Sequence, residues 1–438
     1  MMSGSMANET FAHNTSKRSP KFHVDRRSFL KTSVVGAGAS IGLAGCLGDD
    51  DETVRLGALY IFSGFASLYG DEAERGYELA EEEINDNGGI DGREVEIIAR
   101  DSEGDADAAT RQLTSLIEED EVDGLFGLDS SGVAQALAPQ IEAVEMPFMV
   151  THAATPFLTS PEGEHENSVG NEWLFRNANS VTHDMYGAAQ IASELDVDEW
   201  MTIGPDYAFG WETWDYFRAF AEGLGVDAEF IGEQYPPLAE SDYTPYIEAV
   251  LSEEPEAVIS PLWGADLTTF LGQAADAGWF DAVEYTLFSV GMGTDLPADG
   301  SPLPEGEFAS TRYDPFVPDS AENNDFRDRY LDEYDTLPTY NAEGAYRAVY
   351  LYKEAIEQAG STDPAEIRDT FTGMEHSGPV GEYRFAEETN QATVPGIWGT
   401  VTYDDDLESN VLSDVQVTGE DPEEIRDAID HSDLPSGV

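Results

Sequence analysis

The chain has 438 residues, of which 89 are acidic and 21 basic, so its formal net charge is −68. Because 41% of the residues are apolar and 11% are aromatic, the chain can build folded cores and is not a disordered acidic segment. The charge excludes nucleic acid and anionic membrane surfaces as partners of the folded body. At about 1 M salt the Debye length falls to roughly 3 Å and screens the repulsion, so the composition is typical of a halophilic protein.

The N-terminal region differs from the rest in charge and pattern. It runs from the basic "DRRSFLK" through a short apolar stretch, Val34 to Gly45, to "LAGC". About 12 residues at 1.5 Å each cannot span a hydrocarbon core of about 30 Å, so this stretch predicts the core of a signal peptide. Arg26 and Arg27 resemble a twin-arginine export signal, and "LAGC" resembles a lipobox. We therefore expect Cys46, the sole cysteine, to become the lipidated first residue of the mature protein.

This pattern predicts the location and the covalent framework of the mature protein. Residues 1–45 are the expected signal peptide and residues 46–53 an acidic tether that holds the protein at the extracellular face of the cell membrane. Since no second cysteine exists, no disulfide can form and the fold depends on its core.

The mature chain alternates short apolar runs with amphipathic helical patterns. In the first half, strands are predicted at 54–61, 93–100, 122–128 and 147–151, with helices at 70–85, from about 105, and at 131–144. In the second half, helices are predicted at 182–195, 211–224, 242–252 and 265–277, with strands at 200–204, 227–232, 256–262 and 284–289. A long helix is predicted at 341–358. Because parallel strands need crossover connections, this alternation predicts two α/β lobes with parallel sheets.

Loops that follow the predicted strands carry the candidate binding residues, since open parallel sheets bind ligands beyond the carboxyl ends of their strands. In the first half these loops are rich in hydroxyls, which with free backbone amides can hold a carboxylate: Ser63, Ser67, Ser130, Ser131, Thr151 and Thr155. In the second half they carry the aromatic residues Tyr207, Phe209, Trp211 and Trp263, which can form an apolar wall. Helix capping and core packing are the alternative roles for these side chains.

Motifs of catalysis and metal binding are missing from the sequence. It contains no G-x-S-x-G and no H-E-x-x-H, and the seven histidines show no metal-like spacing. We therefore expect no enzyme activity, no cofactor and no metal; an exported enzyme is the alternative that a catalytic motif in the cleft would support.

Several segments resemble the branched-chain amino acid type of periplasmic substrate-binding protein. They are the run from "SGFASLYG" to "VDGLFG", then "SSGVAQALAPQIEAVEMPFM", "AATPFL", "AYRAVYLYKEAIEQAG" and "GPVGEYRF". The resemblance covers nearly all of residues 54–403. It implies an α/β fold of two doubly wound Rossmann-like lobes joined by a three-stranded hinge. Lobe 1 would comprise 54–176 and about 310–395, lobe 2 would comprise 177–309 and about 396–420, and 421–438 would be a C-terminal tail.

The resemblance also implies a function and a set of ligand contacts. The protein would be a monomeric solute receptor of an ABC importer, with a small-molecule solute and the permease and ATPase subunits as partners. Family positions that hold the ligand's carboxylate correspond to Ser131 with Ser130 beside it, and to Ala153 and Thr155. Family aromatics over the ligand correspond to Tyr69, to Tyr207 or Phe209, and to Trp263.

One loop departs from the family pattern. Amino-acid binders carry an acid after the strand that matches 284–289, where it pairs with the ligand's ammonium. Here the loop reads "SVGMGTD", with Gly291 near the expected spot, Asp295 several residues later, and Asp266 placed to cap a helix. Branched-chain amino acids, amides, urea and aromatic acids therefore all stay open as ligands, and a sensory ligand-binding module stays open as an alternative to transport.

Overall fold

The computed structural model describes residues 53–161, 165, 167–292, 303–404, 407, 409–418, 425 and 429. The predicted export and lipidation residues Arg26, Arg27 and Cys46, and also Asp295, lie outside these ranges. From Thr53 onward the described residues belong to one compact unit. None of its helices is both long enough and apolar enough to cross a membrane, within the described ranges.

The first sheet is parallel and has the order β2-β1-β3-β4-β5. Its strands are β1 (Thr53–Tyr60), β2 (Glu94–Asp101), β3 (Gly124–Gly127), β4 (Phe148–Val150) and β5 (Leu174–Arg176). The connections between them contain α1 (Ser67–Asp86), α2 (Ala106–Glu118) and α3 (Ser131–Val144). As predicted, α2 begins just after Asp105, whose side chain caps it by accepting from the Ala108 N–H.

The second sheet is mixed and has the order β14-β13-β10-β9-β8-β6-β7. The parallel strands are β6 (Glu199–Ile203), β7 (Glu229–Gln234), β8 (Ala257–Ser260), β9 (Tyr285–Phe288) and β10 (Phe308–Thr311). The long strands β13 (Gly396–Asp404) and β14 (Ser409–Thr418) add an antiparallel hairpin at one edge. The helices that accompany this sheet are α4 (Val181–Glu194), α5 (Ala208–Gly223), α6 (Thr244–Glu253), α7 (Gly264–Ala277) and α8 (Trp279–Ala282).

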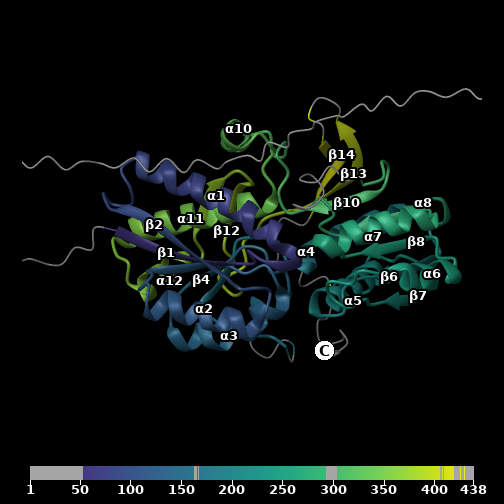
Figure 1. Ribbon diagram of the computed structural model, residues 1–438, viewed down its shortest axis with the longest axis horizontal. Coiled ribbons are helices and arrows are strands. Elements are labelled where there is room, and N and C mark those ends of the chain that lie inside the picture. Colours follow the sequence, from purple (N-terminus) through teal and green to yellow (C-terminus); the bar gives the residue numbers. More distant parts are fainter. Residues whose placement is uncertain are drawn as a thin grey trace, which may run out of the picture. The chain divides into compact units, whose positions relative to one another are not determined.

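The chain passes between the two sheets three times: after β5, after β10 and before β13. Between the second and third crossings lie α10 (Ala321–Tyr334), α11 (Tyr340–Ala359), α12 (Pro364–Phe371) and the two-stranded sheet of β11 (Glu375–Gly378) and β12 (Gly381–Arg384). Helix α11 lies along α1, and a Cβ on Gly76 would come within 2.0 Å of the Ala342 carbonyl oxygen. Figure 1 shows α1, α2, α11 and α12 around the first sheet and α5 to α8 around the second. The predicted two-lobed α/β architecture is confirmed.

Some strands escaped the sequence prediction for physical reasons. Strands β5 and β10 have three and four residues, which is too short for a periodic pattern to stand out. Strand β14 is an edge strand whose residues are mostly half-buried or exposed, so its polar residues gave no apolar run.

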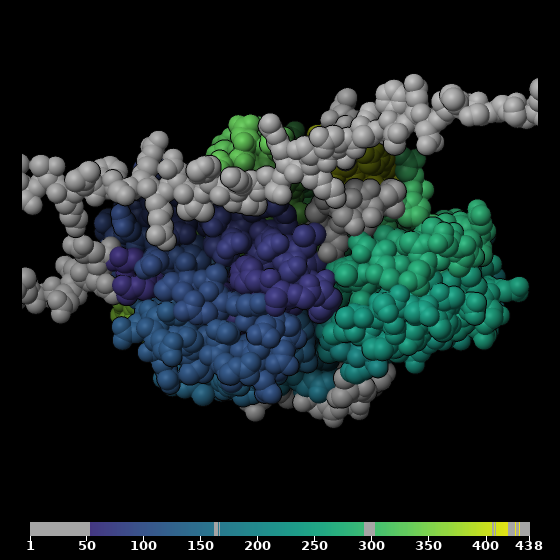
Figure 2. Space-filling model, viewed as in Figure 1, coloured from purple at the N-terminus to yellow at the C-terminus, as the bar shows by residue number. Residues whose placement is uncertain are grey.

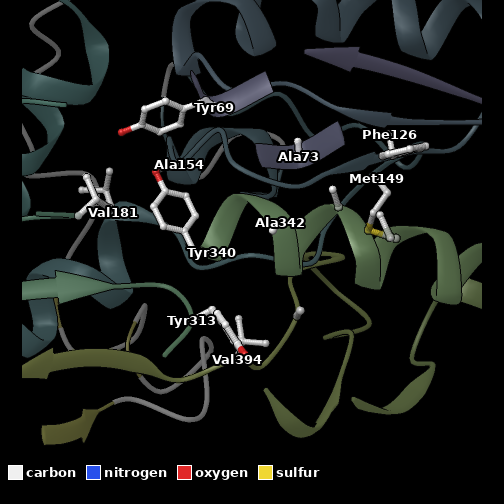
Figure 3. Packing of buried hydrophobic residues seen from close by; sticks show 14 of the residues in the cluster. Tyr69, Ala73, Phe126, Met149, Ala154, Val181, Tyr313, Tyr340, Ala342 and Val394 are labelled. Atoms are coloured by element: carbon white, nitrogen blue, oxygen red, sulfur yellow. The ribbon is translucent and has the colours of Figure 1, made fainter. Parts of the chain in front are cut away.

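Apolar side chains gather in three clusters. One lies within the first lobe around Leu125 and Phe148, and another within the second around Val258 and Phe270. The largest contains residues of both sheets, among them Phe126 and Ile259. Figure 3 shows part of this cluster where α11 meets neighbouring segments. The two lobes are therefore packed together by buried apolar surface.

Candidate ligand-binding site

Loops from the carboxyl ends of strands in both sheets meet around a small cavity. It encloses about 310 Å³, part of which is open to solvent. Residues at the starts of α1, α3, α5 and α7 point to it, together with residues after β4, β9 and β10. Its lining residues are Tyr69, Asp129, Ser131, His152, Ala154, Tyr207, Phe209, Trp263, Val290, Arg312 and Tyr340.

The predicted contact residues divide into two groups. Tyr69, Ser131, Tyr207, Phe209 and Trp263 line the cavity. The other three, Ser130, Ala153 and Thr155, are buried beside lining residues in the chain but are not part of the lining.

Ser131 is the first residue of α3 and forms a polar corner of the cavity. Its Oγ accepts hydrogen bonds from the backbone N–H groups of Ala154 at 3.2 Å and Thr155 at 3.1 Å. A hydroxyl that accepts in this way still has its own proton to donate. The corner therefore presents a hydroxyl donor whose oxygen is held by two backbone N–H groups, and such a donor suits a carboxylate oxygen.

The Thr155 side chain points away from this corner. Its Oγ1 accepts from Gln135 Nε2 at 3.2 Å and donates to Glu212 Oε1 at 2.9 Å. Since Glu212 belongs to α5, the Thr155 hydroxyl links the two lobes. Since its backbone N–H donates to Ser131 Oγ, Thr155 supports the site by holding the Ser131 hydroxyl in position.

Aromatic rings from both lobes form the apolar walls. Trp263 packs edge-to-face against Phe65 and Tyr69, with ring centroids 5.0 and 5.2 Å away. Tyr69 also meets Tyr340 at 6.2 Å. Figure 3 shows Tyr69 and Tyr340 projecting toward the same space beside Ala154. Such an arrangement suits a flat apolar body.

Asp129 is the one carboxylate among the described lining residues, and it is already engaged. Its Oδ1 lies 2.8 Å from His152 Nδ1, and its Oδ2 accepts from the Ile61 N–H at 2.8 Å. The other ring nitrogen of His152 lies 3.2 Å from the Asn341 carbonyl oxygen. Asp129 therefore holds His152 and the loop after β1 in place.

Arg312 brings a positive charge to the cavity from the crossing after β10. Its Nη1 donates to the His152 carbonyl oxygen at 2.6 Å, and its Nη2 donates to Asp184 Oδ2 at 3.1 Å. The guanidinium also lies over the Tyr340 ring at 5.6 Å. Burial is the strongest influence on the pKa of Arg312 and lowers it, but Asp184, Tyr340 and Tyr69 together outweigh burial, so the pKa is raised and Arg312 is charged.

The sequence analysis missed these lining residues: Asp129, His152, Ala154, Val290, Arg312 and Tyr340. The first four lie in or next to loops that it had selected, so their positions were within reach of the strand-end argument. Arg312 follows a strand that was not predicted, and Tyr340 begins a helix that contributes to the site only through its packing on α1. Across the described ranges, no cluster of three or more His, Cys, Asp or Glu side chains could hold a metal ion.

Comparisons with known proteins identify a family for this chain. The family model described as periplasmic binding protein matches residues 53–405. Leu/Ile/Val-binding protein homolog 7 of Brucella suis is 28% identical over 236 residues, which cover 52% of this chain and 56% of that protein. Homolog 8 of Brucella abortus is 33% identical over 266 residues, which cover 57% of this chain and 62% of that protein. The chain thus spans little more than half the length of these curated relatives.

Solved structures share the fold over most of the chain. A solute-binding protein of an ABC transporter from Rhodopseudomonas palustris BisB5 superposes with a TM-score of 0.75 at 22% identity, covering 85% of this chain and 100% of that one. A leucine-binding protein from Thermotoga maritima gives a TM-score of 0.72 at 20% identity, covering 85% and 99%. An ABC transporter substrate-binding protein from Sphaerobacter thermophilus gives a TM-score of 0.72 at 26% identity, covering 84% of this chain and 98% of that one. By its sequence and its two-lobed type I fold, this chain belongs to the periplasmic binding protein family.

Proposed function

We propose that this protein is the extracellular solute receptor of an ABC importer and that its ligand is a small carboxylate of the aromatic-acid class. The charge of the cavity supports this most directly. The described lining contains one guanidinium, Arg312, whose Nη atoms bind His152 and Asp184 but whose Nε has no hydrogen-bond partner among the described residues, and the Ser131 hydroxyl; its one carboxylate, Asp129, has partners at both oxygens.

An α-amino acid would fit this charge arrangement poorly. Its ammonium needs an acceptor, and burying an unpaired charge is costly. Asp266, the acid at the start of α7 that the sequence analysis considered, is not among the lining residues and accepts from the Ala239 N–H at 3.1 Å. Burial also raises the pKa of Asp266 to about 6. Amides and urea lack the carboxylate that would use Arg312, so an acid without an ammonium is favoured.

Solved proteins of this fold bind both aromatic acids and amino acids. Rhodopseudomonas palustris proteins of this fold have been solved in complex with benzoate and with 4-hydroxybenzoate, and one from Streptococcus pneumoniae in complex with isoleucine. The preference for an aromatic acid here therefore rests on the lining of this cavity and on its aromatic walls.

We infer that binding works by closure of the two lobes around the ligand. The lining residues Tyr69, Ser131, Phe209 and Trp263 are buried, and side chains from both lobes meet at the site. Figure 2 shows the first-lobe surface in contact with the surface of the second lobe. A ligand must enter when the lobes are apart, and contacts with both lobes then shift the population to a closed form that the permease can recognise.

The same proposal includes the N-terminal anchor. A lipid on Cys46 and export through the Arg26–Arg27 signal would keep the receptor beside its permease on the outer face of the membrane. Anchoring then supplies a high local concentration of receptor without any spanning helix.

A thermal-shift screen of the protein in concentrated KCl tests the ligand class. A ligand that binds only the folded state raises the melting temperature by an amount that grows with RT ln(1 + [L]/Kd). Benzoate and 4-hydroxybenzoate should stabilise the protein, whereas benzylamine, which keeps the ring and reverses the charge, should not. Leucine, isoleucine and valine serve as the competing class. Stabilisation by leucine in the absence of any benzoate effect would overturn the aromatic-acid assignment.

A further inference from the structure

A second and larger cavity lies at the crossings between the lobes. It encloses about 1130 Å³, part of it open to solvent. Its walls come from the segment after β10, with Arg312 and Val317, and from the turn before β12, β12 itself and the segment that leads to β13, with Val380, Arg384 and Val394. It shares Arg312 with the ligand cavity but none of the other residues that line it.

Positive charge is concentrated in this cavity although the chain is strongly acidic. Two of the 21 basic residues of the sequence, Arg312 and Arg384, line it. The described lining contains one carboxylate, Glu382, whose residue is exposed to solvent. Valine and proline side chains make up most of the remaining wall. The cavity therefore combines cationic groups with apolar surface.

The fold holds the guanidinium of Arg312 and the backbone of Arg384 in place. Arg312 is fixed by the His152 carbonyl and by Asp184, as described above. Arg384 is fixed through its backbone: its N–H donates to Thr393 Oγ1 at 3.0 Å, and its carbonyl accepts from the Thr393 N–H at 2.8 Å. Thr393 also lines the cavity, so it adds a hydroxyl near Arg384. A fixed guanidinium, a second arginine on an anchored backbone and a neighbouring hydroxyl are polar features of the kind that orient a ligand in a binding site.

We propose that this cavity is a second binding site, which takes a small organic anion with an apolar body. The carboxylate would lie at Arg384 and the apolar part against Val380 and Val394. Because the walls belong to the segments that connect the lobes, rotation of one lobe against the other changes the cavity. A bound anion therefore favours the lobe arrangement that fits it. The site itself does not depend on which ligand occupies the cleft.

Fluorine NMR titration of the full chain with 4-fluorobenzoate tests the site. The cleft is blocked by Ser131→Phe or, independently, by Gly132→Trp, where a Cβ would lie 3.8 Å from Tyr207 Cδ2. The second cavity is altered by Arg384→Gln and, independently, filled by Val380→Trp. Arg111→Gln changes an exposed arginine on α2 and is the matched control. Near-UV circular dichroism verifies that each variant is folded.

Saturable binding should survive both cleft blocks and the Arg111 control. When the cleft is also blocked, the remaining binding should weaken by at least about tenfold with Arg384→Gln, since a charge-assisted hydrogen bond is lost, and disappear with Val380→Trp. If the wild-type protein binds one 4-fluorobenzoate and loses it only in the second-cavity variants, the second site is supported and the proposal of an aromatic acid in the cleft is contradicted. The inference would be overturned if the cleft-blocked variants showed no saturable binding. It would also be overturned if the wild type had a single site that the cleft blocks remove and Arg384→Gln leaves unchanged.

Discussion

Thr155 and Glu212 join the two lobes by a buried hydrogen bond, in which Thr155 Oγ1 donates to Glu212 Oε1 at 2.9 Å. The second carboxyl oxygen of Glu212 is buried and has no hydrogen-bond partner among the described residues. Burial raises the pKa of Glu212 from 4.5 to about 8, although the Thr155 hydroxyl and the Arg176 guanidinium oppose the rise; the Asp215 carboxylate adds to it. Glu212 is therefore mostly protonated at neutral pH while the lobes are closed.

This relationship predicts that ligand binding depends on pH. When the lobes open and water reaches Glu212, we expect its pKa to return toward 4.5. Closure then takes up a proton. The stabilisation of the closed form by protonated Glu212 is therefore complete below about pH 4.5 and is lost as the pH rises to about 8. Affinity for the cleft ligand should fall by at least about tenfold across that range.

The variant Glu212→Gln isolates this effect, since glutamine cannot ionise and keeps the shape of the neutral acid. Calorimetric titration across the same pH range should give a nearly constant affinity in this variant. Glu222→Gln, which changes an exposed acid on the same helix, should keep the wild-type slope. A wild-type affinity that does not change with pH would contradict the role of Glu212.

Replacing Ser131 by alanine should weaken ligand binding by about tenfold, because one hydroxyl donor to the carboxylate is lost. The fold should survive, since only one hydroxyl is removed from the start of α3. Binding is measured by calorimetry and folding by the melting temperature. Ser130→Ala is the comparison, because Ser130 lies outside the cavity lining and its side chain makes no capping hydrogen bond. Equal losses in both variants would remove the special role of Ser131.

Trp263 should be a major contributor to ligand affinity, because it is a lining residue that packs on Phe65 and Tyr69 of the other lobe. Trp263→Ala should cost about 2 kcal/mol or more of binding free energy, as expected for a buried aromatic anchor. Trp211→Ala removes a half-buried tryptophan of the same lobe that meets Tyr235 at 6.5 Å and does not line the cavity. Calorimetry should show a small change for that control, and a comparable loss in both would contradict the assignment.

Arg176 should be a stability residue, because its three donor nitrogens join two segments, the loop after β4 and the stretch around Gln391. They donate to Gln391 Oε1 at 2.5 Å, the Thr155 carbonyl oxygen at 2.6 Å and Thr159 Oγ1 at 2.8 Å. Burial first, and the nearby Arg312 second, lower the pKa of Arg176 to about 9, so it is still charged at neutral pH. Arg176→Met should lower the free energy of unfolding by about 3 kcal/mol, because the acceptors are left without a donor. Denaturant unfolding measures this loss, which Arg111→Met should not reproduce.

Cys46→Ser should release the protein from the cell membrane into the medium, because serine cannot receive the thioether-linked lipid. Fractionation of cells that express the variant measures this. The double variant Arg26→Lys, Arg27→Lys is the export control and should keep the protein inside the cell. A Cys46→Ser protein that stays with the membrane would contradict the anchor.

The strand-helix alternation of both lobes was predictable because it rests on local apolar periodicity. Helix α11 was expected at 341–358 and spans Tyr340–Ala359. The prediction failed for the hairpin of β13 and β14, where pairing between strands, and not local pattern, makes the structure. The loops that carry Tyr69, Ser131 and Trp263 were identified because strand ends gather at one edge of a parallel sheet.

The sequence by itself determined which strand-end loops would meet at one cavity and which residues could signal export. Tertiary structure alone decided the charge of the cavity. Arg312 meets His152 and Asp184 across separations of 160 and 128 residues, and no local pattern encodes such contacts. Packing of α11 on α1 likewise brings Tyr340 opposite Tyr69. The kind of ligand depends on these long-range contacts, because they determine which charges and rings share one buried space.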